Sequence, residues 1–337
     1  MSAGFTWRDG ERLIRFGPGV SGEAARLVEE AGFRGYALLS TERALARPPP
    51  GLGEGAAEVL EVPYGRVDEV SAELFDAAGG RSLVALGGGR VIDVAKALAG
   101  SRDGGRCAAI PTTLSGAPMT PFHRTPAGVG GARRVRPALV VADPELMTSQ
   151  PPRMMAGSAM NALAHAMESL YTPLANPVSE LAALRAASLI ALGLPVAASR
   201  SEDLGLASIL AGYAVGSTGL ALHHAVCQTI VRVAGTPHAE TNAVMLPHFA
   251  RLMADRAPRE LGALARALGD PAGDPASAAG PISELAARSG HTRLSTLGVT
   301  EEQLPQIADA AQGHHGIGLT PQPPDRDELL RVLRDAL

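Results

Sequence analysis

The feature that most constrains the fold of this chain is a change of pattern near Arg153. Before it, short apolar runs that read as strands alternate with segments of helical spacing. The runs are LIRFG (13–17), YALLS (36–40), AEVLEV (57–62), SLVALG (82–87) and CAAIPT (107–112). The helical segments between them are 21–32, 66–79 and 91–100. This alternation predicts a mostly parallel sheet covered by helices, and the Gly-rich segment 124–144 predicts a hairpin.

After Arg153, Ala- and Leu-rich periodic segments follow one another with few β-branched runs. They are 153–171, 177–193, 202–228, 241–255, 258–268, 281–289, 301–312 and 326–337. Such a succession predicts an all-helical domain. We therefore expect an α/β domain over residues 1–152 and a helical domain over 153–337. The boundary lies at QPPR (150–153), where proline favours the start of a helix.

Composition excludes several classes of protein. The 337 residues carry a formal net charge of −4 and only 3% aromatic side chains, which argues against a nucleic-acid-binding protein. No apolar run reaches the roughly 18 residues of a membrane span, and the first residues lack the apolar core of a signal peptide. With Cys107 and Cys227 alone, a disulfide framework is not expected. We expect a cytoplasmic protein that binds neither nucleic acid nor membrane.

Three glycines, Gly87, Gly88 and Gly89, separate the run SLVAL from the helical segment VIDVAKALAG. A glycine turn between a strand and a helix lets backbone N–H groups converge on an anion, and the helix dipole adds to the attraction. The alternative is a plain strand-to-helix turn, with a surface ion pair between Asp93 and Lys96, the only lysine. The glycines alone leave both interpretations open.

The segment PTTLSG (111–116) follows the next predicted strand. Its hydroxyls, on Thr112, Thr113 and Ser115, come where ligands bind in open α/β sheets, beyond the carboxyl ends of the strands. A hydroxyl-rich turn is by itself more often only a turn. Together with the glycine turn, it predicts the second wall of a pocket.

Five of the nine histidines fall between 165 and 248. Asn161 and His165 are spaced i, i+4 and share one helical face, and His223, His224, His238 and His248 follow. An amide oxygen and three imidazoles could hold a divalent metal that polarises a carbonyl; the alternative is histidines packed among helices. Because an amide is a weaker donor than a carboxylate, any bound ion is expected to be held weakly.

The ordered motifs of the chain resemble those of the iron-containing alcohol dehydrogenases. They are GGGRVIDVAK, PTTLSGAPMT, DPELM, MNALAHAMESLY, the HH pair and TPHAETNAVMLPH. Within this superfamily, which is related to dehydroquinate synthase, the chain is most similar to the maleylacetate reductase branch. The resemblance implies a Rossmann-like domain that binds NAD(P), an all-α domain, an active site in the cleft between them, a small-molecule substrate and a homodimer.

The resemblance also assigns roles to single residues. The cofactor-binding positions are Glu42, Gly87, Gly88, Gly89, Asp93, Thr112, Thr113, Ser115 and Leu146. The metal positions, for iron or zinc, are Asn161, His165, His224 and His238. An acidic Glu42 would accept hydrogen bonds from a ribose 2′-hydroxyl and repel a 2′-phosphate, so NAD is expected rather than NADP.

Three residues depart from the family pattern: Arg90 after the glycines, Pro118 in place of a glutamate, and Gln228 in place of a histidine. If the family's histidine at this position donates the proton, another group must do so here, because glutamine does not relay protons near neutral pH. The alternative is that Gln228 only reflects a different substrate. The candidate catalytic residues are His223, His224 and His238, and we expect His223 to be the donor. The expected function is NAD(P)H-dependent reduction of an activated alkene or carbonyl of a small carboxylate. The alternative is a repurposed family member that catalyses a non-redox step or only binds a ligand.

Overall fold

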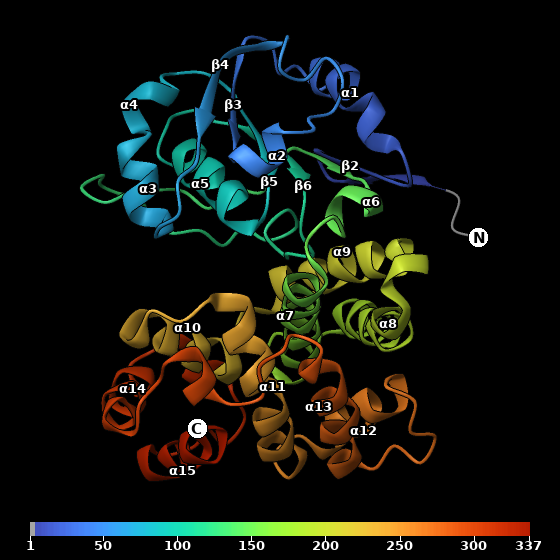
Figure 1. Ribbon diagram of the computed structural model, residues 1–337, viewed down its shortest axis with the longest axis vertical. Helices are drawn as coiled ribbons and strands as arrows, with labels where there is room; N and C mark the ends of the chain where they lie inside the picture. The colour runs from blue at the N-terminus through green and yellow to red at the C-terminus, as the bar shows by residue number, and fades with distance from the viewer. Residues whose placement is uncertain (1–3) are drawn as a thin grey trace. The chain divides into compact units, whose positions relative to one another are not determined.

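The computed structural model describes residues 4–337 and divides into two compact units, Met1–Gln150 and Pro151–Leu337. The division lies close to the proline-rich boundary seen in the sequence. The first unit is an α/β fold and the second is all helical, as the two sequence patterns predict (Figure 1).

The first unit is built on a seven-stranded sheet in the order β1-β2-β7-β6-β5-β3-β4. Its strands are β1 (Phe5–Asp9), β2 (Arg12–Phe16), β3 (Tyr36–Ser40), β4 (Ala56–Glu61), β5 (Leu83–Gly87), β6 (Cys107–Pro111) and β7 (Leu139–Ala142). β1 is antiparallel to β2, and the other adjacent pairs are parallel. The central strands β3, β5, β6 and β7 are buried throughout, which explains why they read as continuous apolar runs.

Helices cover both faces of this sheet. They are η1 (Val20–Glu23), α1 (Ala24–Glu30), α2 (Glu42–Leu45), α3 (Val67–Glu73), α4 (Phe75–Ala78), α5 (Gly89–Gly100) and α6 (Pro144–Met147). α3 and α5 pack into one apolar cluster with the strands, and α1 packs into a second cluster on the other face (Figure 1).

One expectation for the first unit needs correction. The predicted hairpin over 124–144 is wrong, because β7 is the only strand in that segment and it pairs in parallel with both β2 and β6. The real hairpin joins β1 to β2 at the Asp9-Gly10 corner, where Gly10 has φ 62°. A positive φ suits glycine, so this dipeptide was the sequence signal for the turn.

The second unit consists of helices. They are α7 (Pro152–Tyr171), α8 (Pro177–Gly193), η2 (Leu194–Ser199), α9 (Ser201–Thr218), α10 (Leu222–Ala234), α11 (His238–Ala254), α12 (Pro258–Ala267), η3 (Pro275–Ala278), α13 (Ala279–Ala287), η4 (Leu294–Leu297), η5 (Glu301–Gln303), α14 (Leu304–Gln312), η6 (His315–Leu319) and α15 (Arg326–Ala336). The single helix predicted over 202–228 is wrong, because it breaks at Gly219, which has φ 81°. The break places His223 and His224 in the first turn of α10.

One apolar segment of this unit, Pro177–Ser199, is long and apolar enough by length and composition to cross a membrane. The bent pair α9 and α10 would qualify only as one span with a 99° bend. The segment carries Glu180 and Arg185 and packs along α7 and α9. Of its most apolar window, 44% is buried, while Leu181 and Leu192 are exposed.

Candidate active site

The glycine turn joins β5 to α5, and side chains from the segment after β6 pack against Gly88 and Gly89. Gly88 is the N-cap of α5 and has φ −76°, so its backbone does not require glycine. Glycine is required here because neighbouring side chains come close. A Cβ on Gly88 would lie 2.9 Å from the Thr113 side chain, and one on Gly89 would overlap the Ser115 hydroxyl. The amides at the start of α5 are therefore framed by hydroxyl side chains, an arrangement that suits an anion.

The predicted second wall lies directly against this turn. The Thr112 N–H donates to Gly87 O at 3.0 Å, which extends the pairing of β5 and β6 by one residue. Thr113 and Ser115 then contact the next two glycines. The structure thus brings together the glycines and hydroxyls that the sequence placed on separate strand ends.

Lys96 has a different role from either sequence interpretation. Its side chain is fully buried, and its ammonium donates to the backbone oxygens of Ala117 (3.0 Å), Thr120 (3.1 Å) and Phe122 (2.6 Å). Lys96 does pair with Asp93, at 2.7 Å, but its own side chain is fully buried, so this is not a surface ion pair. The lysine therefore holds the loop after the second wall and keeps that wall against the glycines.

The other predicted cofactor positions lie at or near the same strand ends. Glu42 is the first residue of α2, two residues after β3, and is exposed. Its neighbour Arg43 donates to Thr112 Oγ1 at 3.2 Å. Leu146 is half-buried in α6, after β7. The Arg90 guanidinium lies 4.9 Å from the centroid of the Tyr64 ring and makes a cation–π contact with it.

The four predicted metal positions come together in the helical unit. α7 carries Asn161 and His165, α10 carries His224, and His238 begins α11. The rings of His165 and His224 are stacked with centroids 4.5 Å apart, and His224 and His238 are 6.5 Å apart. The Asn161 side-chain oxygen lies 3.3 Å from His224 Nε2.

Glu168 is a member of this cluster that sequence reasoning missed. It is fully buried on α7, and its carboxylate lies 2.6 Å from His224 Nδ1 and accepts the His224 backbone N–H at 3.2 Å. Burial raises the pKa of this carboxyl, and the N–H groups at the start of α10 oppose that rise. The available signal was an acidic residue three positions after His165 in an otherwise apolar helix.

Burial also changes the titration of the histidines. It lowers the pKa of His223 to about 3, and it lowers the pKa values of His165 and His224 well below their ordinary value. Neighbouring imidazoles push in the same direction. His223 was the expected proton donor, but it is fully buried and carries no second proton at neutral pH.

The donor set disfavours a tightly held divalent ion by its charge rather than by its contacts. Asn161 and three imidazoles bring no negative charge. Because His224 Nδ1 donates to Glu168, the His224 Nε2 lone pair and the Asn161 oxygen face each other at 3.3 Å, as two ligands of one ion would. His165 Nδ1 is buried without a hydrogen-bond partner, which also favours a ligand there. Among residues 4–337, however, no group of three or more His, Cys, Asp or Glu is arranged to hold a metal.

The two remaining departures have partners of their own. The Pro118 oxygen accepts from the Arg12 guanidinium at 3.0 Å. Gln228 Oε1 lies 3.3 Å from His314 Nε2, and His314 Nδ1 accepts the Gly316 N–H. The Gly316 contact leaves the His314 proton on Nε2, from which it donates to Gln228. The glutamine position therefore still contacts an imidazole.

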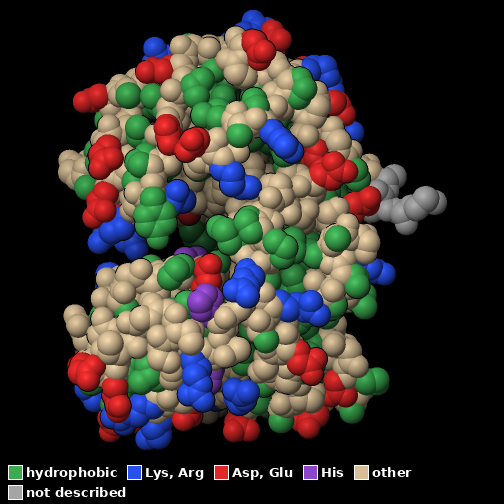
Figure 2. Space-filling model, viewed as in Figure 1, with side chains coloured by type: hydrophobic (Ala, Val, Ile, Leu, Met, Phe, Trp, Pro, Cys, Tyr) green, Lys and Arg blue, Asp and Glu red, His purple; other side chains and the backbone are tan. Residues whose placement is uncertain are grey.

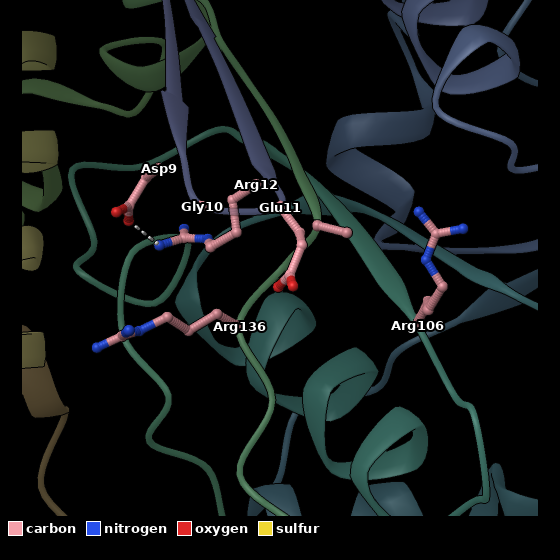
Figure 3. A pocket seen from close by; sticks show the side chains of 7 residues that line it. Asp9, Gly10, Glu11, Arg12, Arg106 and Arg136 are labelled. Atoms are coloured by element: carbon pink, nitrogen blue, oxygen red, sulfur yellow. Dashed lines mark hydrogen bonds and ion pairs between the residues drawn. The ribbon is translucent and has the colours of Figure 1, made fainter.

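A pocket of about 460 Å³ opens at the opposite strand ends of the first unit. It is lined by Asp9, Gly10, Glu11, Arg12, Arg106, Arg136 and Ala138. Figure 3 shows Arg12 directed to Asp9 while Arg106 points away from both. The Arg12 guanidinium is also bound to Pro137 O and Pro118 O, so its role there is structural.

The surface has a mixed charge pattern. Figure 2 shows acidic and basic side chains interspersed on the face in view of each unit, without a continuous basic stripe among the residues described there.

Comparison with known proteins agrees with this geometry. Residues 155–337 match the model of the Fe-containing alcohol dehydrogenase family, C-terminal. Maleylacetate reductase 2 of Cupriavidus pinatubonensis is 38% identical over 284 residues, 79% of each chain. Maleylacetate reductase of Burkholderia cepacia is 34% identical over 96% of this chain and 95% of its own. The crystal structure of maleylacetate reductase from Agrobacterium tumefaciens superposes with a TM-score of 0.83 at 31% identity, covering 100% of this chain and 99% of that one.

These matches cover both the glycine turn and the imidazole cluster. Family membership implies the use of NAD(P) and of a divalent metal, although the four positions of this chain do not form a strong metal site. The fold, the assembled motifs and the relatives lead to one conclusion: the chain belongs to the iron-containing alcohol dehydrogenase family and is an NAD(P)-dependent oxidoreductase.

Proposed function

We propose that this enzyme reduces the carbon–carbon double bond of a small unsaturated keto-carboxylate, of the maleylacetate type, with NADH. The observation that carries the proposal is the cluster of neutral imidazoles in place of a charged metal site. Its relatives at 30–38% identity that are named maleylacetate reductase support this choice of substrate.

The reaction adds a hydride and a proton across the double bond. When bound, the cofactor would supply a hydride, with both electrons, to the carbon farther from the carbonyl, and the carbonyl oxygen would become an enolate. An imidazole N–H of the cluster would donate a hydrogen bond to that oxygen and lower the energy of the enolate. The His223 N–H faces Asn242 and the His224 N–H faces Glu168, so neither is that donor. A proton from solvent water would then bond to the carbon next to the carbonyl. His223 does not supply it, because the ring is buried and its pKa lies near 3.

The proposed cofactor site is the glycine turn with its hydroxyl wall. When bound, the pyrophosphate would be held by the amides at Gly88 and Gly89 beside Thr113 and Ser115, and Leu146 would give an apolar contact. Glu42 favours NADH by accepting from the ribose 2′-hydroxyl. The positive charge of the adjacent Arg43, which donates to Thr112, would weaken this preference for NADH over NADPH.

Metal has no step in this proposal. We propose that the enzyme works without a tightly held iron or zinc, that it is a homodimer, and that it acts in the cytoplasm. The rival function is a repurposed family member that performs a non-redox step or only binds a ligand. An assembled glycine turn favours the oxidoreductase, since a chain that no longer binds dinucleotide has no need of it.

The test uses deuterium-labelled NADH with maleylacetate and with small aldehydes. We expect deuterium in the carbon skeleton of the reduced acid, and little transfer to the aldehydes. Titration of NADH fluorescence with the pure protein is the second arm. Saturable binding without label transfer to any substrate would reject the reductase, and absence of binding would favour the repurposed function.

A further inference from the structure

A guanidinium without an acidic partner lies at the beginning of α5. Arg90 is the second residue of this helix and directly follows the glycine turn. Its guanidinium lies 4.9 Å from the centroid of the ring of Tyr64, a residue of the loop after β4 that is 84% exposed. Among residues 4–337, no carboxylate forms an ion pair with Arg90, and its Nε is buried without a hydrogen-bond acceptor. This cation therefore has no partner of opposite charge in the described chain.

The place of this charge is unfavourable in the chain without a ligand. The N-terminus of a helix carries a partial positive charge, which stabilises nearby anions and destabilises nearby cations. The only acidic residue of α5 is Asp93, and its carboxylate is paired with Lys96 at 2.7 Å. Partial burial also removes water from the Arg90 guanidinium and lowers its pKa. An oxyanion bound at the turn would offset both the helix charge and the lost hydration.

The sheet places the partner of Arg90 and the hydroxyl wall on opposite sides of the glycine turn. In the strand order β6-β5-β3-β4, the strands β4 and β6 lie on opposite sides of β5. Thr113, after β6, packs against Gly88, whereas Tyr64, after β4, contacts Arg90. An oxyanion at the first amides of α5 would therefore have hydroxyl groups on one side and a guanidinium on the other.

The structure assigns to Arg90 the binding of phosphate oxygens of the cofactor's pyrophosphate, and this assignment rests on the proposed function. A guanidinium can donate two parallel N–H···O bonds to one phosphate, which an ammonium group cannot do. Tyr64 is a positioning residue, because its ring face holds the guanidinium near the turn without a negative charge that would compete with phosphate. The charge of Arg90 thus serves ligand binding and not the folding of α5.

The first test measures the NADH dissociation constant by fluorescence titration. Arg90→Met removes the charge but keeps an unbranched side chain against the Tyr64 ring, so we expect the constant to rise by about 10- to 100-fold, as when a charge-assisted hydrogen bond is lost. Arg90→Lys keeps the charge without the planar fork and should raise it by less. An unchanged constant in Arg90→Met would overturn the assignment. So would a raised KM for the substrate at unchanged NADH affinity, since the guanidinium would then bind a substrate carboxylate instead.

The second test separates binding from a structural role. Without ligand, Arg90→Met should unfold at a temperature no lower than the wild type, because the charge that it removes is unfavourable at a helix N-terminus. A lower unfolding temperature would show that Arg90 supports the fold, contrary to the assignment. Tyr64→Ala should weaken NADH binding by about two- to fivefold, the value of an exposed cation–π contact, and Tyr64→Phe should retain wild-type affinity because it keeps the ring. Equal affinities of these two variants would refute the role of the Tyr64 ring.

Arg106→Met is the matched control. The Arg106 guanidinium also lies 4.9 Å from the centroid of an aromatic ring, that of Phe33, but Arg106 directly precedes β6 and so lies at the opposite ends of the strands. The same change of charge there should leave the NADH dissociation constant within about twofold, since salt screens a distant surface charge. An equal loss of affinity in Arg106→Met and Arg90→Met would attribute the effect to net charge and refute a specific contact.

Inorganic pyrophosphate separates this assignment from the proposed function. We expect pyrophosphate to raise the unfolding temperature of the wild-type enzyme and to have a much smaller effect on Arg90→Met. If the wild type binds pyrophosphate in this way but reduces no substrate, the reductase function fails and the assignment of Arg90 stands. If pyrophosphate stabilises both proteins equally, or stabilises neither, the assignment is wrong.

Discussion

At the scale of single residues, Glu168 is the group on which the imidazole cluster depends for its geometry. It accepts from the His224 ring and from the His224 backbone N–H, and it lies without exposure between α7 and α10. A carboxylate in this position both orients the ring and satisfies the open end of α10, whose N-cap Ala221 offers no side chain for that purpose.

Replacing Glu168 should therefore destabilise the helical unit. In Glu168→Ala the His224 donors stay buried without a partner, so we expect the free energy of unfolding to fall by about 2–5 kcal/mol. Glu168→Gln keeps an accepting oxygen and should lose less than half of that. Chemical denaturation followed by circular dichroism measures both. An alanine variant as stable as the wild type would contradict this role.

The buried histidines predict a defined pH dependence of stability. The pKa of His223 is lowered to about 3, and those of His165 and His224 are also lowered. As pH falls below about 6.5, the unfolded chain binds protons that the folded chain does not, so stability is lost. Each such group contributes up to about 1.4 kcal/mol per pH unit.

The raised pKa of Glu168 acts in the opposite direction, because the folded chain then holds a proton that the unfolded chain has released. Because three histidines outnumber one glutamate, the free energy of unfolding should still decrease as the pH falls. Denaturation midpoints of the metal-free protein between pH 7 and pH 5 measure it. A flat profile would mean that the three rings take up protons in the folded state.

At this scale the sequence predicts which residues lie together, but not which partners their side chains hydrogen-bond to. Asn161, His165, His224 and His238 could be chosen by motif, and the structure brings them together. Glu168 could not, because it acts on a ring of another helix. Spacing along one helix contains no information about a partner on the next.

At the scale of elements, the β5–α5 turn shows why its glycines matter. Gly88 has an ordinary φ, so the reason is contact: a Cβ would lie 2.9 Å from Thr113. Gly88→Ala should push the hydroxyl wall away and weaken NADH binding by tenfold or more, about 1.4 kcal/mol. Fluorescence titration with NADH measures the change.

Gly280→Ala is the matched control for this prediction. Gly280 lies in α13, is exposed, and has nothing within 4 Å of an added Cβ. The alanine should leave NADH binding unchanged. Equal NADH affinities for the two variants would show that the turn is not the cofactor site.

The errors in predicting elements have one physical origin. Strand 139–142 pairs with residues more than a hundred positions away, at β2, and no local pattern contains that register. The break between α9 and α10 depends on a single glycine at positive φ within an apolar segment whose periodicity continues across it. The long, buried elements were predictable because their sequences are rich in apolar residues.

At the scale of the whole molecule, the two sequence patterns correspond to two units with separate tasks. The first contains the glycine turn proposed to bind the cofactor and the second contains the imidazoles, so a ligand of either unit is a ligand of the folded chain. Any molecule that binds only the native state raises its stability in proportion to the logarithm of its concentration over Kd. Thermal unfolding of the intact enzyme can therefore distinguish what each unit binds.

We expect NADH to raise the unfolding temperature of the wild-type enzyme and Zn²⁺ to leave it unchanged. The reason is the neutral donor set: none of the four positions is a carboxylate, and Glu168 contacts the other nitrogen of the His224 ring, Nδ1. Asn161→Asp supplies a negative charge at a ligand position, so Zn²⁺ should stabilise this variant, and a chelator should reverse the effect. Dialysis of the wild type against the chelator should leave label transfer from NADH intact. A wild-type enzyme that loses activity on chelation and regains it with metal would show that the imidazoles bind an ion despite the amide, and the metal-free mechanism would have to be abandoned.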